Sequence, residues 1–145
     1  MWFDKKHPNA VYTDIRTEDR IELAGGNGRV LSVSPDIEAD FRSLPFESET
    51  FYLVVFDPPH LKKLGLNTWM AQKYGVLFST WEQDLRQGFD ECMRVLKPNG
   101  TLIFKWNEHQ VTLNQVLDLF PIKPLFGHTT GKHGKTIWVT FMKLT

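Results

Sequence analysis

The fold is decided by the stretch Phe51-Tyr52-Leu53-Val54-Val55-Phe56-Asp57-Pro58-Pro59-His60. Its first six residues are a continuous apolar run rich in valine and aromatic side chains, which predicts a β-strand. A run without polar alternation is typical of a strand buried on both faces, as in a parallel sheet. The strand is expected to end at Asp57, because the two prolines that follow lack the backbone N–H that a sheet requires.

Helical and strand patterns alternate on the C-terminal side of this run. The expected elements are a helix over 81–96 with Thr80 as N-cap, a turn over 97–100, a strand over 101–106, a helix over 111–120, and strands over 123–127 and 136–142. Before the run, strands are expected over 9–16 and 36–40, with a hairpin between them that turns at Gly25-Gly26-Asn27-Gly28.

This order predicts one α/β domain over residues 1–145 with a mostly parallel sheet. The last two strands are joined without a helix, so they are expected to form an antiparallel pair at the C-terminus. The strand over 9–16 is expected to pair beside 51–56.

Composition sets the broad class of protein. The chain has 145 residues, of which 41% are hydrophobic, and 17 basic and 17 acidic residues give a formal net charge of zero. A packed core is therefore expected. Zero net charge disfavours strong nonspecific binding to nucleic acid, although it is compatible with a local basic patch. The single Cys92 excludes an internal disulfide and a CxxC zinc site, and no metal site is expected. No apolar stretch suits a membrane span or a signal peptide, so we expect a soluble cytoplasmic protein.

Polar residues follow four of the expected strands. They are Asp14, Asp40, Asp57 and the run Trp106-Asn107-Glu108. In open α/β sheets, ligands bind beyond the carboxyl ends of the strands, so these residues are candidates for one site.

Asp57-Pro58-Pro59-His60 resembles the Asp-Pro-Pro-aromatic motif of class I S-adenosylmethionine-dependent methyltransferases that modify exocyclic amines of adenine or cytosine. Two further stretches are similar to segments of that family. They are Asp40-Phe41-Arg42-Ser43-Leu44-Pro45-Phe46 with the strand that follows it, and Arg94-Val95-Leu96-Lys97-Pro98-Asn99-Gly100-Thr101-Leu102-Ile103. The resemblance covers roughly residues 36–145.

The resemblance implies a reduced Rossmann-like methyltransferase fold that binds S-adenosylmethionine. It places Asp40, Phe41 and Phe56 at the cofactor, and Asp57, Pro58, Pro59 and His60 at the amine that accepts the methyl group. Asp14, at the end of its own expected strand, would accept hydrogen bonds from the ribose hydroxyls of that cofactor. The family's glycine-rich cofactor loop leads into a helix. Here the glycines at 25–28 lead into an expected strand, so they are interpreted as a hairpin turn and the cofactor loop is missing.

Other residues are candidates for contact with substrate or nucleic acid. Asn107 and Glu108 would line the substrate mouth. Lys132 and Lys135 would contact a phosphate backbone, and Lys62 belongs to a second small basic cluster after the DPPH motif. The segment 67–78 is either a lid or a packed connection. The implied partners are RNA or DNA, a small flat substrate, or a partner subunit, and a homo-oligomer stays open.

Each of these assignments has a plainer alternative. Asp14 could pair with Arg16 or Arg20, Arg42 could pair with a nearby carboxylate, and Asn107 and Glu108 could end a strand and cap a helix. The whole chain could be a non-catalytic binding module that has lost the cofactor loop.

Overall fold

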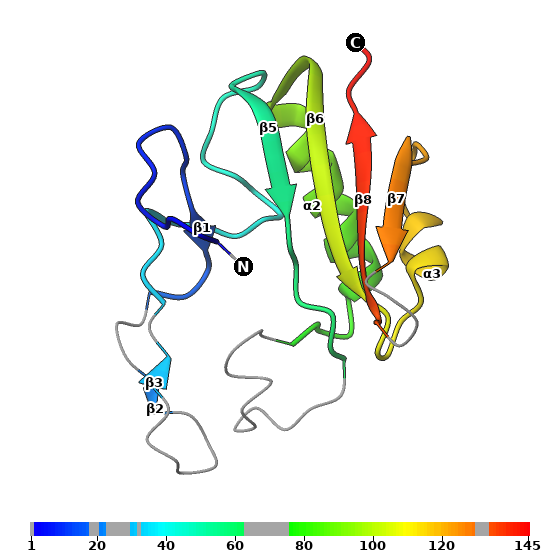
Figure 1. Cartoon of the computed structure of the whole chain (residues 1–145), viewed down its shortest axis with the longest axis horizontal. Coiled ribbons are helices and arrows are strands. Elements are labelled where there is room, and N and C mark those ends of the chain that lie inside the picture. Colours follow the sequence, from blue (N-terminus) through cyan, green and yellow to red (C-terminus); the bar gives the residue numbers. More distant parts are fainter. Residues whose placement is uncertain (1, 18–20, 23–29, 32, 63–75, 130–133) are drawn as a thin grey trace.

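The computed structural model describes residues 2–17, 21–22, 30–31, 33–62, 76–129 and 134–145. Its centre is a mixed four-stranded sheet in the order β5 (Phe51–Phe56), β6 (Leu96–Asn107), β8 (Thr136–Met142) and β7 (Phe126–Thr129) (Figure 1). β5 and β6 are parallel, whereas β6–β8 and β8–β7 are antiparallel. The closing antiparallel pair is confirmed. The expectation of a mostly parallel sheet is wrong here, because β8 returns between β7 and β6.

Both helices in the described part of the chain pack on one face of this sheet. α2 (Trp81–Val95) joins the parallel strands β5 and β6, and α3 (Leu113–Leu117) follows β6 (Figure 1). The helix expected over 81–96 is confirmed to within one residue, because its apolar spacing is local information. The helix expected over 111–120 is shorter, since tighter turns replace it ahead of Pro121.

The core lies between the helices and the sheet. It is built from alternate residues of β6 and β8 and from the buried faces of α2 and α3, and it includes Leu85, Phe89, Cys92, Leu102, Phe104, Trp106, Val116, Ile137, Val139 and Phe141. Phe89 stacks on Phe120 with ring centroids 4.2 Å apart. This alternation is the period of a strand with one covered face.

The opposite face of the sheet, the uncovered face, has no helix over it in the described residues. Leu53 is therefore 57% exposed, and at the start of the same strand Tyr52 is 75% exposed. The expectation that 51–56 is buried on both faces is wrong, because an apolar run cannot tell whether both faces of its sheet are covered.

The N-terminal part of the chain forms two small pairs of strands. β1 (Thr13–Asp14) is parallel to β4 (Ile37–Glu38), and β2 (Ile21–Glu22) is antiparallel to β3 (Val30–Leu31). The expected hairpin is confirmed in its strands, although the glycines at 25–28 lie outside the described residues. The expected pairing of 9–16 with β5 is wrong, because the carbonyls of Tyr12 and Asp14 accept from the chain at 36–39.

Two connections fix how α2 sits. Its last residue, Val95, is followed directly by Leu96 of β6, and both are buried. Arg94 donates to the carbonyls of Leu44 and Phe46, while Glu91 accepts from the backbone N–H of Leu44. The segment before β5 is thus fastened along the helix. No helix in the described part of the chain has the length and apolarity that a bilayer span requires.

Candidate functional site

The Asp-Pro-Pro-His motif lies at the carboxyl end of β5, as the sequence predicts. The Asp57 carboxylate is partly exposed, and its Oδ2 lies 3.1 Å from Nζ of Lys105 on the neighbouring strand β6. Lys105 therefore has a role that its place in an apolar strand did not reveal: it holds Asp57 toward the uncovered face of the sheet. The pair is charged and accessible to a ligand.

Behind Asp57 the motif turns inward. Pro58 is buried, and His60 is half-buried with its ring edge-on to Trp106 at a centroid distance of 6.3 Å. Burial lowers the pKa of His60 from its ordinary 6.5, and the nearby charge of Asp57 opposes this only in part. His60 is therefore mainly neutral at pH 7, with one ring nitrogen able to accept a proton.

The residues that follow β6 hold the backbone in place. Asn107 donates from Nδ2 to Thr136 Oγ1 at 3.2 Å and accepts at Oδ1 from the backbone of His109 at 3.0 Å. Glu108 accepts at Oε1 from the N–H of Leu113, the first residue of α3, at 2.7 Å. These contacts match the plainer alternative of a strand end and a helix cap. The substrate contact expected of both residues stays a prediction.

Asp14 and Asp40 form the same small motif at the ends of two paired strands. Each aspartate is followed two residues later by an arginine that turns back onto it, Arg16 with Nη2–Oδ2 at 3.0 Å and Arg42 at 2.6 Å. The backbone N–H of each arginine also donates to its aspartate at 2.9 Å. Because β1 and β4 are parallel neighbours, the two motifs lie near each other.

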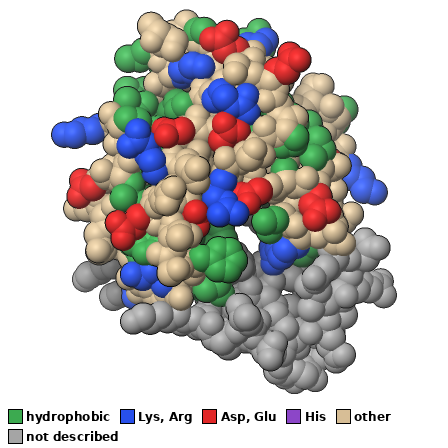
Figure 2. All heavy atoms as spheres, turned by 180° about the vertical axis from the view of Figure 1, so that it is seen from behind, with side chains coloured by type: hydrophobic (Ala, Val, Ile, Leu, Met, Phe, Trp, Pro, Cys, Tyr) green, Lys and Arg blue, Asp and Glu red, His purple; other side chains and the backbone are tan. Residues whose placement is uncertain are grey.

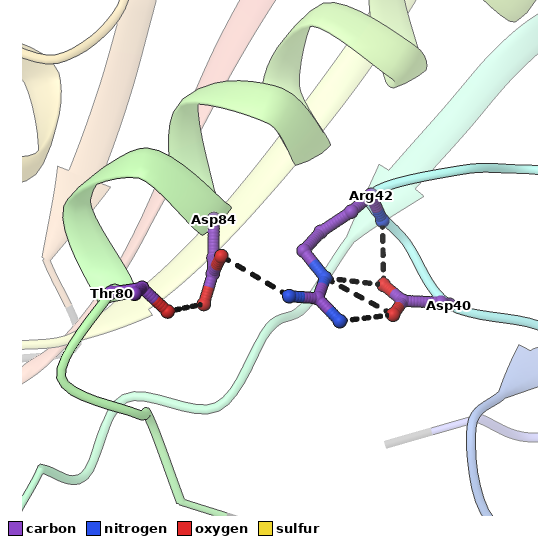
Figure 3. A network of polar contacts seen from close by, with 4 residues as sticks. All are labelled: Asp40, Arg42, Thr80 and Asp84. Atoms are coloured by element: carbon purple, nitrogen blue, oxygen red, sulfur yellow. Dashed lines mark hydrogen bonds and ion pairs between the residues drawn. The ribbon is translucent and has the colours of Figure 1, made fainter.

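Arg42 links Asp40 to the first turn of α2 (Figure 3). Its Nη1 lies 3.3 Å from Oδ1 of Asp84, whose Oδ2 accepts from Thr80 Oγ1 at 2.8 Å. Asp84 is the one buried charged side chain among the described residues, and it is not among the residues that the sequence predicts for the site. Its signal was a carboxylate in the first turn of a helix, where the helix dipole favours negative charge. Thr80 precedes α2 as expected but makes no side-chain bond to the backbone there.

Phe41 and Phe56, expected at the cofactor, contact each other edge-on with centroids 5.2 Å apart. Both rings lie against Gly88 of α2, where a Cβ would come within 2.5 Å of Phe41 and 2.7 Å of Phe56. Phe56 also contacts Phe104 of β6. The ring surfaces that make these contacts are packed in the core. Only the remaining surface of half-buried Phe41 is therefore accessible to a ligand.

The basic candidates fall in different places. Nζ of Lys62 lies 5.1 Å from the centre of the Trp81 ring, which places this charge beside the start of α2. Lys135 is exposed, and its carbonyl accepts from the backbone of Glu108. Lys132, and the segment 67–75 of the expected lid, lie outside the described residues. Seen from the helix side, basic and acidic side chains are interspersed over the described residues (Figure 2).

S-adenosylmethionine fits these residues in part. Asp40 accepts four contacts from Arg42, at 2.6 to 3.1 Å, which fill the positions that a carboxylate offers. A cofactor amine would have to displace Arg42 from it. The carboxylate of Asp14 keeps room for a further donor such as a ribose hydroxyl, alongside Arg16. Among the described residues no three His, Cys, Asp or Glu side chains converge on a metal position.

Comparison with known proteins adds no family. No protein-family model matches the sequence, and no curated protein matches it. The resemblance of the motifs therefore carries the functional argument together with the geometry above.

Proposed function

We propose that this chain transfers a methyl group from S-adenosylmethionine to an amine of a nucleobase or a similarly flat substrate. The observation that carries the proposal is the place of Asp57-Pro58-Pro59-His60 at the carboxyl end of β5, beside the parallel strand β6. Ligands of α/β sheets bind at such ends. The ion pair with Lys105 supports a role for Asp57, because it orients a carboxylate that remains accessible.

Each residue of the motif has a task in this proposal. The two prolines fix the backbone and remove two donors, so that neighbouring carbonyls stay free to accept from a flat amine. Asp57 accepts the second N–H of the amine, and His60 offers a neutral ring beside the base. Holding the nitrogen in line with the methyl group contributes most of the acceleration, because positioning replaces an encounter in solution.

When bound, S-adenosylmethionine would supply an electrophilic methyl group. The amine nitrogen would give its lone pair to that carbon while the carbon–sulfur bond broke, with sulfur keeping the bonding pair. The nitrogen then carries one proton too many. In this proposal Asp57 takes that proton, and its partly exposed carboxylate supports passing the proton on to water.

The test is transfer of a radiolabelled methyl group to a panel of nucleosides and single-stranded DNA and RNA. Asp57→Asn keeps the shape of the side chain but removes its charge, and we expect it to lower the rate by about 100-fold or more. Asp90→Asn is the matched control, because Asp90 is an exposed carboxylate paired with Arg86 on α2. Full activity of folded Asp57→Asn would overturn the assignment.

A second candidate function is a binding module without catalysis, and the contacts of Asp40 favour it. If Arg42 keeps Asp40 occupied, the cofactor loses one of its expected partners. Calorimetric titration with S-adenosylhomocysteine distinguishes the two functions. Binding that Asp14→Ala weakens supports the enzyme, whereas no binding at millimolar ligand supports the module.

A further inference from the structure

The uncovered face of the four-stranded sheet carries a hollow of about 520 Å³ that the proposed reaction does not use. Its lining comes from β6, β7 and β8 and consists of Ile103, Phe126, Gly127, His128, Trp138 and Thr140. The volume falls within the range of about 300–1,000 Å³ that is typical of small-ligand sites. Most of the lining is apolar or aromatic.

The strand register brings the rings of this hollow together. His128 of β7 lies opposite Trp138 of β8, and Phe126 lies opposite Thr140. Residues two apart on a strand share a face, so Phe126, His128 and Trp138 point to the same side of the sheet. Phe126 is 68% exposed, and a contact with a ligand would cover apolar surface that water now meets.

One side chain, that of Lys105, contacts both the lining of the hollow and the candidate site. On β6, Lys105 lies opposite Trp138, and its Nζ is 5.8 Å from the centre of that ring. The same Nζ is 3.1 Å from Asp57. Asp57 and Trp138 are thus two strands apart, roughly 10 Å. A ligand of a few linked rings can reach both.

We propose that this hollow holds a base of a single-stranded nucleic acid, next to the nucleotide whose amine lies at Asp57. The inference rests on the proposed function and names its substrate class. Exposed aromatic rings on a sheet stack on bases of any sequence. The bases of a duplex are paired and stacked on each other, so they are not accessible to such rings, whereas those of a single strand are. Lys105, which contacts both Asp57 and Trp138, and the exposed Lys135 just before β8 offer positive charge to the phosphates between the bases.

The experiment measures binding of labelled single-stranded DNA and RNA by fluorescence anisotropy, with no cofactor present. Trp138→Leu and Phe126→Leu keep an apolar side chain but remove the rings. We expect each to weaken binding by about 5- to 150-fold. Tyr52→Leu is the control. Tyr52 is about as exposed as Phe126, but it lies at the amino end of β5, away from Asp57 and the hollow. The exposure of Phe126 means that its variant should fold normally.

The outcomes separate this inference from the proposed function. Weakened binding in both ring variants, with duplex bound more weakly than single strands, supports the hollow even if no methyl transfer is found. Unchanged binding in both variants overturns it, even if Asp57→Asn abolishes transfer. It is also overturned if Tyr52→Leu weakens binding equally, or if the ring variants impair only S-adenosylmethionine binding.

Discussion

Replacing Gly88 with alanine tests how tightly α2 is packed against the segment that carries Asp40. Gly88 lies on the buried face of α2, and an added Cβ would be 2.5 Å from Phe41 and 2.7 Å from Phe56. Carbon atoms in contact prefer about 3.5–4.0 Å, so each approach is about 1 Å too short. Phe56 is buried and contacts Phe41, so an added methyl group could be accommodated only by a shift of half-buried Phe41 away from the helix.

Two opposing terms set the size of the effect. Alanine in a helix interior is favoured over glycine by about 1 kcal/mol. Overpacking a core by one methyl group costs about 1–3 kcal/mol. The net expectation for Gly88→Ala is a loss of about 1 kcal/mol in the free energy of unfolding, or about 2–4 °C in Tm for a chain of this size.

Urea unfolding followed by circular dichroism measures this loss. Gln87→Gly, at the exposed neighbouring position, reports the cost of glycine in this helix without a packing change. A Phe41→Ala background removes the 2.5 Å approach and leaves space into which Phe56 can move, so Gly88→Ala should become neutral or stabilising there. The reasoning is refuted if Gly88→Ala alone raises stability by about 1 kcal/mol, since that is the propensity gain with no clash.

Three further predictions concern other parts of the chain. Thr112→Ala removes the capping box of α3 and should lower the free energy of unfolding by about 1 kcal/mol, while Thr112→Ser should not; equal urea midpoints for both would contradict the cap. Bonds from Arg42 hold the pKa of Asp40 below its ordinary 3.8, so this stabilisation is present above pH 3.8 and is lost as the pH falls through the lowered value. Arg42→Gln should therefore raise the Asp40 pKa in a carboxyl NMR titration, and an unchanged value would contradict the pair. Burial raises the pKa of the Cys92 thiol, so a thiol reagent at pH 8 should label it only after unfolding in urea; rapid labelling of folded protein would show that the site opens.

Sequence patterns located the elements whose information is local. The spacing of Leu85, Phe89 and Cys92 predicted α2, and alternation predicted β8 with both of its ends. What the patterns could not give was the identity of strand neighbours. The apolar run of β5 would have the same sequence pattern with β1 beside it as it has in this fold, where β1 pairs with β4. Strand pairing depends on contacts between distant segments, and no single run encodes them.

In the candidate site, too, the residues set by local sequence were predictable and the contacts between distant segments were not. Asp57 follows β5 as predicted, because a strand ending in two prolines is a local signal. Its partner Lys105 comes from 48 residues away and shows only as a charge within an apolar strand. The buried Asp84 escaped for a similar reason. A carboxylate in the first turn of a helix normally faces water, and only the fold brings Arg42 to it.

The direct passage from α2 into β6 limits how the length of this chain can vary over evolution. One residue inserted between Val95 and Leu96 would turn the helix by about 100° relative to the strand. The buried stripe of α2 would then face water, or β6 would slip by one residue and exchange its two faces. The exposed residues 121–123, ahead of β7, carry no such coupling. Relatives of this chain should therefore differ in length at 121–123 and keep the spacing across 95–96 constant.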